Sequence, residues 1–471
     1  MRRPPGAPAW LCLLVIAAAA ACSDEPSISP AAEPSRPSIL LVVIDTLRAD
    51  RLGCYGYGRP TSPSIDALAS RGVVFDHAQS TSSWTVPSIG SMFTGHSAGR
   101  HGAGRIRGRS GQFLAHDAEK EFLQPDETLP TLAEILRAHG YATGAIASNP
   151  WLESTPAFEK GFDDYTVKTR MSPGESITRL ALDWLDARQG EQQGGQPGGQ
   201  PVFLFVHLMT PHSPYAPGPK ARGRFSGDPS GPYPVTPWEV WPVVDELTAR
   251  QRAFISDAYD EEVLSTDGAV ARLISGIEER GLAEDTLVVV TSDHGEELFD
   301  RGGFDHGHSL HGEVLRIPLI VSGLDLKPRR VSHAVSIQDL PQTLLEAAGV
   351  PEPHRSSLGG VSLWPLLRGE APWPARPLIA AGTIYGADQR SITRWPFKLI
   401  VTDGAEPKLY DLASDPGEQH ELSASHEMLR IELEAELARL GTTRAEEDVP
   451  ALELDEEQRE ALKGLGYVAD P

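Results

Sequence analysis

The sequence predicts an α/β fold, in which a large mixed, mostly parallel sheet is flanked by helices and followed by a smaller C-terminal α+β subdomain. Long apolar runs recur along the chain with helical patterns between them, and such runs are typical of strands buried on both faces. The 471 residues also suffice for one large domain plus a smaller one. We place the large domain at residues 38–375 and the subdomain at residues 376–471.

The first 37 residues read as targeting and tether segments. Arg2 and Arg3 precede the apolar run Leu11–Ala21, which has the length of a signal peptide and is too short to span a bilayer as a stable helix. The run ends in Ala-Ala-Ala-Cys22, which resembles a bacterial lipoprotein signal. We expect a signal peptide at residues 1–21, a lipid on Cys22 and a flexible tether over residues 22–37. The protein would then be exported and anchored on the periplasmic or cell-surface face of a bacterial membrane; an ordinary cleaved signal with an incidental cysteine is the alternative.

Charge and cysteine content narrow the function classes. The formal net charge is −23, and removal of Arg2 and Arg3 with the signal would leave −25. So negative a chain argues against nucleic acid as a partner, and an anionic ligand would need a local positive centre, most simply a metal ion. Cys54 alone would remain beyond the signal and the lipidated cysteine, so the mature chain would form no intrachain disulfide.

The individual elements follow in chain order. The predicted strands of the large domain are Ser38–Asp45, Tyr141–Ser148, Val202–Met209, Thr286–Ser292 and Pro318–Ser322. The helical patterns between them cover Thr128–Gly140, Ser176–Arg188 and Glu261–Gly281. After a boundary at Trp373–Arg376 come the short strands Leu378–Ala381 and Phe397–Val401 and two terminal helices. Strands that alternate with helices predict parallel pairs with right-handed crossovers.

Polar side chains stand where four predicted strands end. They are Asp45-Thr46, Ser148-Asn149, Thr210-Pro211-His212 and Asp293-His294. A single Asp or His at a strand end is more often a turn or a cap. Four such ends at the carboxyl edge of one sheet, where open α/β sheets bind their ligands, instead predict a functional site.

Thr85 precedes an apolar, helix-like stretch that runs to Gly95. One interpretation is a threonine N-cap with Pro87 in the first turn. The other is functional, because a hydroxyl at a helix N-terminus lies where the helix dipole favours an alkoxide and a bound oxyanion. A metal ion at that point would lower the hydroxyl pKa further and create a nucleophile.

His306 and His308 lie in a glycine-punctuated loop that follows Asp293 and His294. Two histidines at this spacing are metal ligands, proton donors or plain surface residues. We favour a catalytic role because the loop can fold back over the strand end that carries Asp293 and His294.

Several motifs follow one another along the large domain: Leu41–Asp50, Gly53–Gly56, Thr61–Pro63, Asp66–Leu68, Thr85–Gly95, Val206–Tyr215, Thr291–Glu296, His308–Leu310 and Arg316–Ile320. In this order they resemble the motifs of the sulfatase family of the alkaline-phosphatase superfamily. Lys398–Ile400, Leu409–Leu412 and Asp415–Glu418 are similar to the family's smaller terminal subdomain. The resemblance covers nearly everything from residue 38 to residue 468 and implies the alkaline-phosphatase type of α/β fold.

The nucleophile segment departs from the family pattern. Typical sulfatases begin it with a Cys or Ser that is oxidised to formylglycine, whereas Thr85 stands here. The arginine expected four residues later is Ile89, and the lysine and histidine that grip the sulfate fall near Ser148 and Pro150. The usual second aspartate after the first strand is Thr46, and the usual Asp-Asn pair is Asp293-His294.

The resulting set of Asp, Thr, Asp and His resembles the superfamily's phosphodiesterases and its phosphoglycerol and phosphoethanolamine transferases, which use an unmodified threonine. The resemblance implies one divalent metal ion held by Asp45, Thr85, Asp293 and His294. An imidazole ligand favours Zn²⁺ or Mn²⁺, with Ca²⁺ or Mg²⁺ left open. Thr85 would attack, and Asn149 would bind a non-bridging oxygen of the substrate. His212 and His308, with His306 as the substitute, would position the substrate or protonate its leaving oxygen.

We therefore expect a metal-dependent hydrolase of anionic esters, with a small molecule, glycan or lipid as substrate. Phosphate mono- or diesters are slightly favoured over sulfate esters, because a threonine ester lacks the hemiacetal exit of formylglycine and the sulfate-gripping residues are replaced. Three alternatives stay open: a true sulfuric ester hydrolase similar to arylsulfatases, a phospho-group transferase, and a non-catalytic surface-binding lipoprotein on a degenerate sulfatase scaffold.

Overall fold

The computed structural model describes residues 36–104, 106–107, 121–168, 173–191, 199–370, 373–441, 451–465 and 467. The predicted signal peptide, Cys22 and nearly all of the predicted tether lie outside the described residues. Arg36–Pro471 forms one compact unit. Among the described helices, none combines the length and the apolar character that a membrane span requires.

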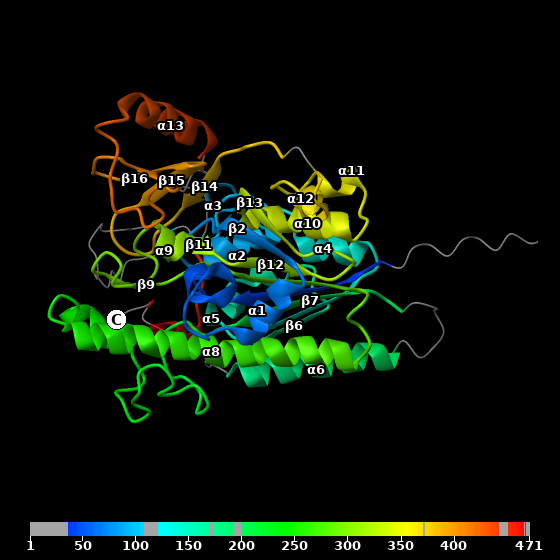
Figure 1. The fold of residues 1–471 in the computed structure, drawn as a ribbon. Helices are drawn as coiled ribbons and strands as arrows, with labels where there is room; N and C mark the ends of the chain where they lie inside the picture. The colour runs from blue at the N-terminus through cyan, green and yellow to red at the C-terminus, as the bar shows by residue number, and fades with distance from the viewer. Residues whose placement is uncertain are drawn as a thin grey trace, which may run out of the picture. The chain divides into compact units, whose positions relative to one another are not determined.

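A mixed sheet forms the centre of the fold (Figure 1). Its described strands are β1 Ser38–Ile44, β2 Val73–Gln79, β5 Ala142–Ala147, β6 Asp164–Val167, β7 Val202–Leu208, β8 Thr286–Ser292, β11 Arg316–Ile317, β12 Leu319–Ser322 and β13 Arg329–Ser336. Their order is β11-β2-β12-β8-β1-β7-β5-β6, with β13 paired to β2. The run from β8 to β6 is parallel, whereas β12 is antiparallel to both β8 and β2. The predicted mixed, mostly parallel sheet is confirmed.

Helices cover both faces of this sheet (Figure 1). On one face lie α1 Pro63–Ser70, α6 Gly174–Glu191 and α8 Ala249–Glu279; on the other lie α2 Thr85–Thr94, α4 Leu132–Ala138, α10 Leu340–Ala347 and α12 Trp364–Arg368. Side chains of β1 alternate between the two layers, so Leu40 and Val42 pack with the first group and Leu41 and Val43 with the second. This two-sided burial explains the continuous apolar run of β1.

The large domain differs from the sequence prediction at the start of one helix and in four additional strands of the central sheet, β2, β6, β11 and β13. Helix α8 begins at Ala249, well before Glu261, because Thr248 and Gln251 form a capping box that starts it there. Strands β2 and β13 were not predicted, since charged residues interrupt their apolar pattern. Asp76 of β2 pairs with Arg330 of the neighbouring β13, which makes those charges compatible with the sheet.

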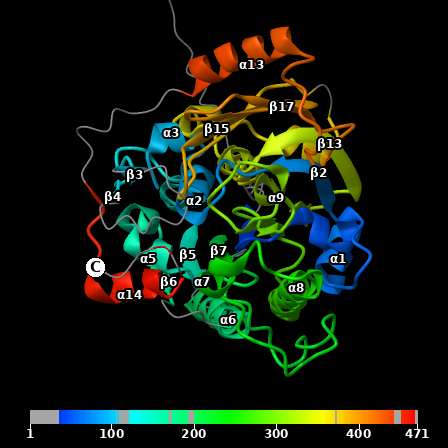
Figure 2. The same ribbon diagram turned by 90° about the vertical axis from the view of Figure 1, so that its left-hand side faces the viewer.

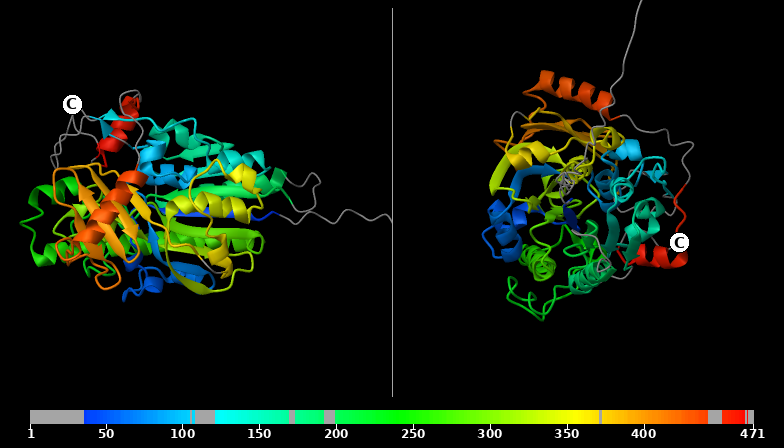
Figure 3. Two further views of the ribbon diagram at one scale, coloured as in Figure 1. Left: turned by 90° about the horizontal axis from the view of Figure 1, so that it is seen from above. Right: turned by 90° about the vertical axis from the view of Figure 1, so that its right-hand side faces the viewer.

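A second sheet, which is antiparallel, follows in the C-terminal part, where an α+β subdomain with two short strands was predicted. It consists of β14 Leu378–Ala381, β15 Gln389–Arg394, β16 Phe397–Thr402 and β17 Lys408–Asp411. Helix α13 Glu427–Leu440 lies across this sheet and buries Leu433 and Leu437 against it (Figure 3). Helix α14 Glu456–Lys463 packs instead against α5 Pro150–Ser154 (Figure 2).

The remaining described α-helices and strands are short. They are α3 Ala98–His101, α7 Pro237–Val240, α9 Gly312–Leu315, α11 Glu352–Arg355, β3 Ile106–Arg107, β4 Glu121–Phe122, β9 Glu297–Leu298 and β10 Phe304–Asp305. Strands β9 and β10 pair as a small hairpin directly after the end of β8. This hairpin carries the chain from Asp293 to His306.

Candidate active site

Two carboxylates meet at the carboxyl edge of the central sheet. Asp45 follows β1 and Asp293 follows β8, and the parallel register that pairs Ile44 with Ser292 brings them side by side. Both are fully buried, and within the described part of the chain Asp45 Oδ1 and Asp293 Oδ2 have no hydrogen-bond partner. Burial and the charge of Asp293 raise the pKa of the Asp45 carboxyl well above its usual value. Within the described ranges, one oxygen of each carboxylate is therefore left without a hydrogen bond at the point where the two acidic groups converge.

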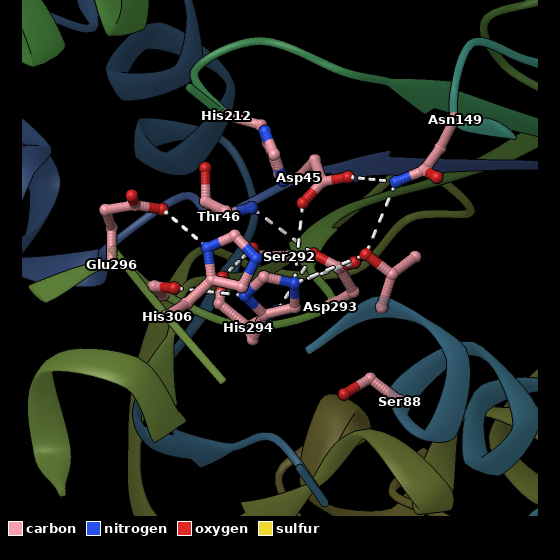
Figure 4. A network of polar contacts seen from close by, with 12 residues as sticks. Asp45, Thr46, Ser88, Asn149, His212, Ser292, Asp293, His294, Glu296 and His306 are labelled. Carbon is pink, nitrogen blue, oxygen red and sulfur yellow. Dashed lines mark hydrogen bonds and ion pairs between the residues drawn. The ribbon is translucent and has the colours of Figure 1, made fainter. Parts of the chain in front are cut away.

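His294 faces both carboxylates (Figure 4). Its Nε2 lies 3.5 Å from Asp45 Oδ1 and 3.5 Å from Asp293 Oδ2. Its Nδ1 lies 3.0 Å from the carbonyl oxygen of Gly295, which can only accept, so Nδ1 carries the proton and Nε2 presents its lone pair to the acidic pair. Burial lowers the pKa of His294 to about 4, which keeps the ring neutral near pH 7. A neutral imidazole with its second nitrogen anchored on a carbonyl has the arrangement of a metal ligand.

Thr85 is the first residue of α2 rather than its N-cap. Trp84 holds the cap position, and no side chain caps the helix. The Thr85 hydroxyl is instead 3.4 Å from His294 Nε2, and Asn149 Nδ2 donates to it at 3.3 Å. The capping interpretation of Thr85 is therefore wrong: its side chain points into the site, at a helix N-terminus where the dipole favours negative charge.

Asn149 contacts both Asp45 and Thr85. Its Oδ1 caps α5 by accepting from the backbone N–H of Trp151 at 2.9 Å. The amide nitrogen is thereby directed to Asp45 Oδ2, at 2.7 Å, and to Thr85. Figure 4 shows Asn149 approaching the acidic pair from the side opposite His306. The structure thus brings Asn149 together with Asp45, Thr85 and Asp293.

The donor set fits a divalent cation. Ligand atoms of Asp45, Asp293 and His294 all lie within 4.8 Å of one another, and the Thr85 hydroxyl adjoins them. A cation there would pair with the two orphaned carboxylate oxygens and the Nε2 lone pair, which otherwise stay buried without compensation. Mixed carboxylate, hydroxyl and imidazole ligands agree with the predicted preference for Zn²⁺ or Mn²⁺ without fixing the metal.

His207 is a site residue that the sequence analysis missed. It lies on β7, fully buried, and within the described residues neither of its ring nitrogens has a hydrogen-bond partner. Its Nε2 is 3.6 Å from Asp45 Oδ2 and 3.9 Å from Asp293 Oδ2. Burial alone would raise the pKa of Asp293, but His294 and His207 outweigh it and lower that pKa to about 2. The alternation of side chains along a strand could have identified His207, because Phe203, Phe205 and His207 point to the same face of β7.

The three predicted acid or base histidines separate into a pair and a single residue. His212 and His306 lie beside His294, with the ring of His306 centred 4.6 Å from that of His294 and 4.8 Å from that of His212. Burial would lower the pKa of His306, but Asp305 and Glu296 raise it well above its usual value. His308 lies elsewhere: its Nε2 is 2.7 Å from Glu297, and its ring meets Trp241 edge-on.

The residues at the family's sulfate-gripping positions have structural roles here. Ile89 is fully buried in the apolar layer beneath α2. Ser148 Oγ accepts from the backbone N–H of Met209 at 3.0 Å, and Pro150 is the first residue of α5. Across the described ranges, no lysine or arginine bonds to Asp45, Asp293 or Thr85.

Comparison with known proteins identifies the family. A sequence model described as Sulfatase matches residues 37–350, well over half of the chain. The chain is 24% identical over 506 residues to an N-acetylglucosamine-6-O-sulfatase of Bacteroides thetaiotaomicron, with 85% of each chain covered.

Solved structures agree with the fold. The structure of BT4656 in complex with D-glucosamine-2-N,6-O-disulfate has a TM-score of 0.66 and 20% identity, covering 86% of this chain and 97% of that one. A phosphonate monoester hydrolase of Agrobacterium radiobacter has a TM-score of 0.63 and 19% identity, covering 86% and 95%. The matched model, the relative and the buried cluster of acidic, hydroxyl and imidazole groups lead to one conclusion: the chain belongs to the sulfatase family and is an ester hydrolase.

Proposed function

We propose that this hydrolase uses unmodified Thr85 as its nucleophile and acts on phosphate mono- or diesters in preference to sulfate esters. The observation that carries the proposal is the position of the Thr85 hydroxyl, 3.4 Å from His294 Nε2 and 3.3 Å from Asn149 Nδ2 at the N-terminus of α2. The side chain does not cap the helix, because Trp84 holds the N-cap position.

The reaction has two displacements. Thr85 Oγ1, after losing its proton to solvent, bonds to phosphorus while the bond to the leaving oxygen breaks. The leaving oxygen takes a proton from the histidine pair formed by His212 and His306. Water then attacks the phosphothreonine and gives one proton to the histidine pair, and the released Thr85 oxygen regains its proton from solvent. A monoester and water thus give alcohol and phosphate, and a diester gives alcohol and a phosphate monoester. A divalent metal bound by Asp45, Asp293 and His294 would supply Lewis-acid stabilisation of the negative charge.

The preference for phosphate rests on what this site lacks. A threonine ester cannot expel its oxyanion through a hemiacetal, so a sulfated enzyme would depend on direct attack by water. Ile89 and Ser148 also face the protein interior instead of a sulfate group. The fold is shared with a phosphonate monoester hydrolase, so it accommodates phosphorus chemistry.

A sulfuric ester hydrolase is the second candidate, and the relatives favour it. The matched relative is named a sulfatase of N-acetylglucosamine, and the BT4656 structure holds a sulfated glucosamine. A sulfated or phosphorylated glycan is therefore the substrate class that we would examine after simple aryl esters.

The test compares matched p-nitrophenyl sulfate, phosphate monoester and phosphodiester, using protein that lacks residues 1–22 and is loaded with Mn²⁺ or Zn²⁺. Thr85→Ala is the critical variant, and Thr94→Ala is its control, because Thr94 lies on the same helix and, among the described residues, its hydroxyl bonds only to the backbone of Gly90 and His96. Phosphoester turnover that is lost in Thr85→Ala alone, with phosphothreonine at residue 85 after acid quenching, supports the proposal. Sulfate turnover lost in the same variant favours the second candidate, and unchanged turnover removes Thr85 from the mechanism.

We also propose that the chain is exported and held at a membrane by a lipid on Cys22, on the grounds of its N-terminal sequence. Metabolic labelling with a radioactive fatty acid should mark the full-length protein and not a Cys22→Ser variant. A labelled Cys22→Ser protein would contradict the proposed anchor.

A further inference from the structure

Tyr467, near the C-terminus, reaches into the active site. Its hydroxyl lies 3.0 Å from His212 Nε2 and 2.8 Å from His306 Nε2. The residue is 5% exposed, and its ring packs edge-on against Trp151 of α5 at 5.5 Å between centroids. One oxygen from the end of the chain thus joins the two histidines that lie beside His294.

The partners of the two imidazoles fix the direction of these hydrogen bonds. His212 Nδ1 faces the carbonyl oxygen of Ser213, so Nδ1 carries a proton, and in the neutral ring Nε2 accepts from Tyr467. His306 Nδ1 faces Glu296 Oε2 at 3.2 Å and Asp305 Oδ1 at 2.8 Å.

A phenol has one proton to donate. Tyr467 donates it to His212, so it must accept from His306 Nε2–H. The two carboxylates beside His306 favour this direction over the reverse, because His212 has no acidic hydrogen-bond partner among the described residues.

Helix α14, which precedes Tyr467, is packed against the large domain. Helix α14 is capped by Asp455 and Gln458 and packs against α5, the helix whose N-cap is Asn149. Leu462, Leu465 and Tyr467 all belong to the main apolar core. The hydroxyl is therefore held in place from outside the loop that carries His306.

We propose that Tyr467 is a positioning residue of the active site, whose hydroxyl holds the Nε2–H of His306 and the ring of His212 in place beside His294. The inference rests on the proposed function, in which this histidine pair protonates the leaving oxygen. Tyr467 keeps the donor N–H inside the site until that oxygen accepts its proton.

The test is Tyr467→Phe, which removes the hydroxyl and keeps the ring on Trp151. A misplaced general acid matters most for poor leaving groups, so kcat for an alkyl phosphate should fall by about 10- to 100-fold, which is part of the roughly 100- to 10,000-fold contribution of general acid catalysis. For the p-nitrophenyl ester, which needs little protonation, kcat should fall less than about 3-fold, and KM should stay similar for both. Tyr165→Phe is the control, because the Tyr165 hydroxyl bonds to the backbone of α5 at Leu152, away from the histidines.

If kcat falls equally for both esters, Tyr467 contributes only packing. If kcat rises, the C-terminal segment obstructs the active site. Either result overturns the inference. Long-range ¹⁵N–¹H spectra of the histidine rings need no turnover. They should show a protonated Nδ1 and a bare Nε2 on His212 and a protonated Nε2 on His306, and both sets of signals should shift in Tyr467→Phe. Unmoved signals also overturn it, whereas activity retained in Thr85→Ala would refute only the proposed function.

Discussion

Replacement of Lys398 by methionine should destabilise the protein in a way that depends on pH. Lys398 is 2% exposed on β16, and its Nζ donates to Glu418 Oε1 at 2.8 Å. His311 contacts the other oxygen of the same carboxylate, and Arg301 binds the adjoining backbone. This network fastens the C-terminal sheet to the segment that follows the active-site hairpin. Methionine keeps the length of lysine but leaves the Glu418 carboxylate without its main counter-charge.

The magnitude follows from the pKa of Glu418. Burial opposes ionisation, but Lys398 and His311 outweigh it and lower this pKa from 4.5 to about 2. A shift of that size corresponds to about 3 kcal/mol of stability at neutral pH, similar to the cost of breaking a buried pair. Because folding lowers the pKa, the contribution is complete above pH 4.5 and is lost as the pH falls through about 2. At about pH 3, roughly 1 kcal/mol of it should remain.

Urea unfolding at about pH 7 and about pH 3, followed by circular dichroism, measures this difference. Wild type should exceed Lys398→Met by about 3 kcal/mol at the higher pH, and the gap should narrow by about 2 kcal/mol at the lower one. Lys408→Met on the neighbouring β17 is the control, since Lys408 is exposed. A gap that stays equal at both pH values would refute the assigned role of Glu418.

Three further predictions concern the metal site and its supports. Dialysis against a chelator should abolish ester hydrolysis, and Zn²⁺ or Mn²⁺ should restore it better than Ca²⁺; full activity in metal-free protein would contradict a metal centre. His207→Ala should weaken metal retention by about 10- to 100-fold in a competition titration, because His207 Nε2 lies 3.6 Å from Asp45 and 3.9 Å from Asp293; an unchanged affinity would leave it a packing residue. Asn149→Ala should lower kcat and also destabilise α5 by about 1 kcal/mol through the lost cap, which thermal melting and kinetics measure together; a lower melting temperature with unchanged kcat would confine Asn149 to capping.

The sheet could be predicted where strands are buried on both faces. β1, β5, β7 and β8 give continuous apolar runs because helices cover them on two sides. Strand β2 escaped prediction because Asp76 and His77 interrupt its run. The start of α8 escaped because Asp260, Glu261 and Glu262 look like a solvated first turn, although all three are buried mid-helix. Arg51 and Arg59 pair with Asp260, and backbone N–H groups satisfy the two glutamates, which no local pattern reveals.

The same limit applies to the site. Residues that end strands, such as Asp45 and Asp293, could be predicted to meet because parallel strands align their ends. The histidines could not be sorted from spacing alone, since His306 and His308 are two residues apart but turn to different carboxylates, Glu296 and Glu297. The residues next to Tyr467 in the sequence give no indication of its role. Its role depends on a contact 161 positions away from His306.

That contact has a practical consequence for anyone who handles the protein. An affinity tag or reporter fused directly after Tyr467 would begin next to a side chain that is hydrogen-bonded to two histidines of the candidate active site. During synthesis, Tyr467 is translated after all the described strands of the central sheet, the last of which, β13, ends at Ser336. A C-terminally shortened chain could therefore fold and load its metal yet remain a poor enzyme, and purity and metal content would not reveal the defect.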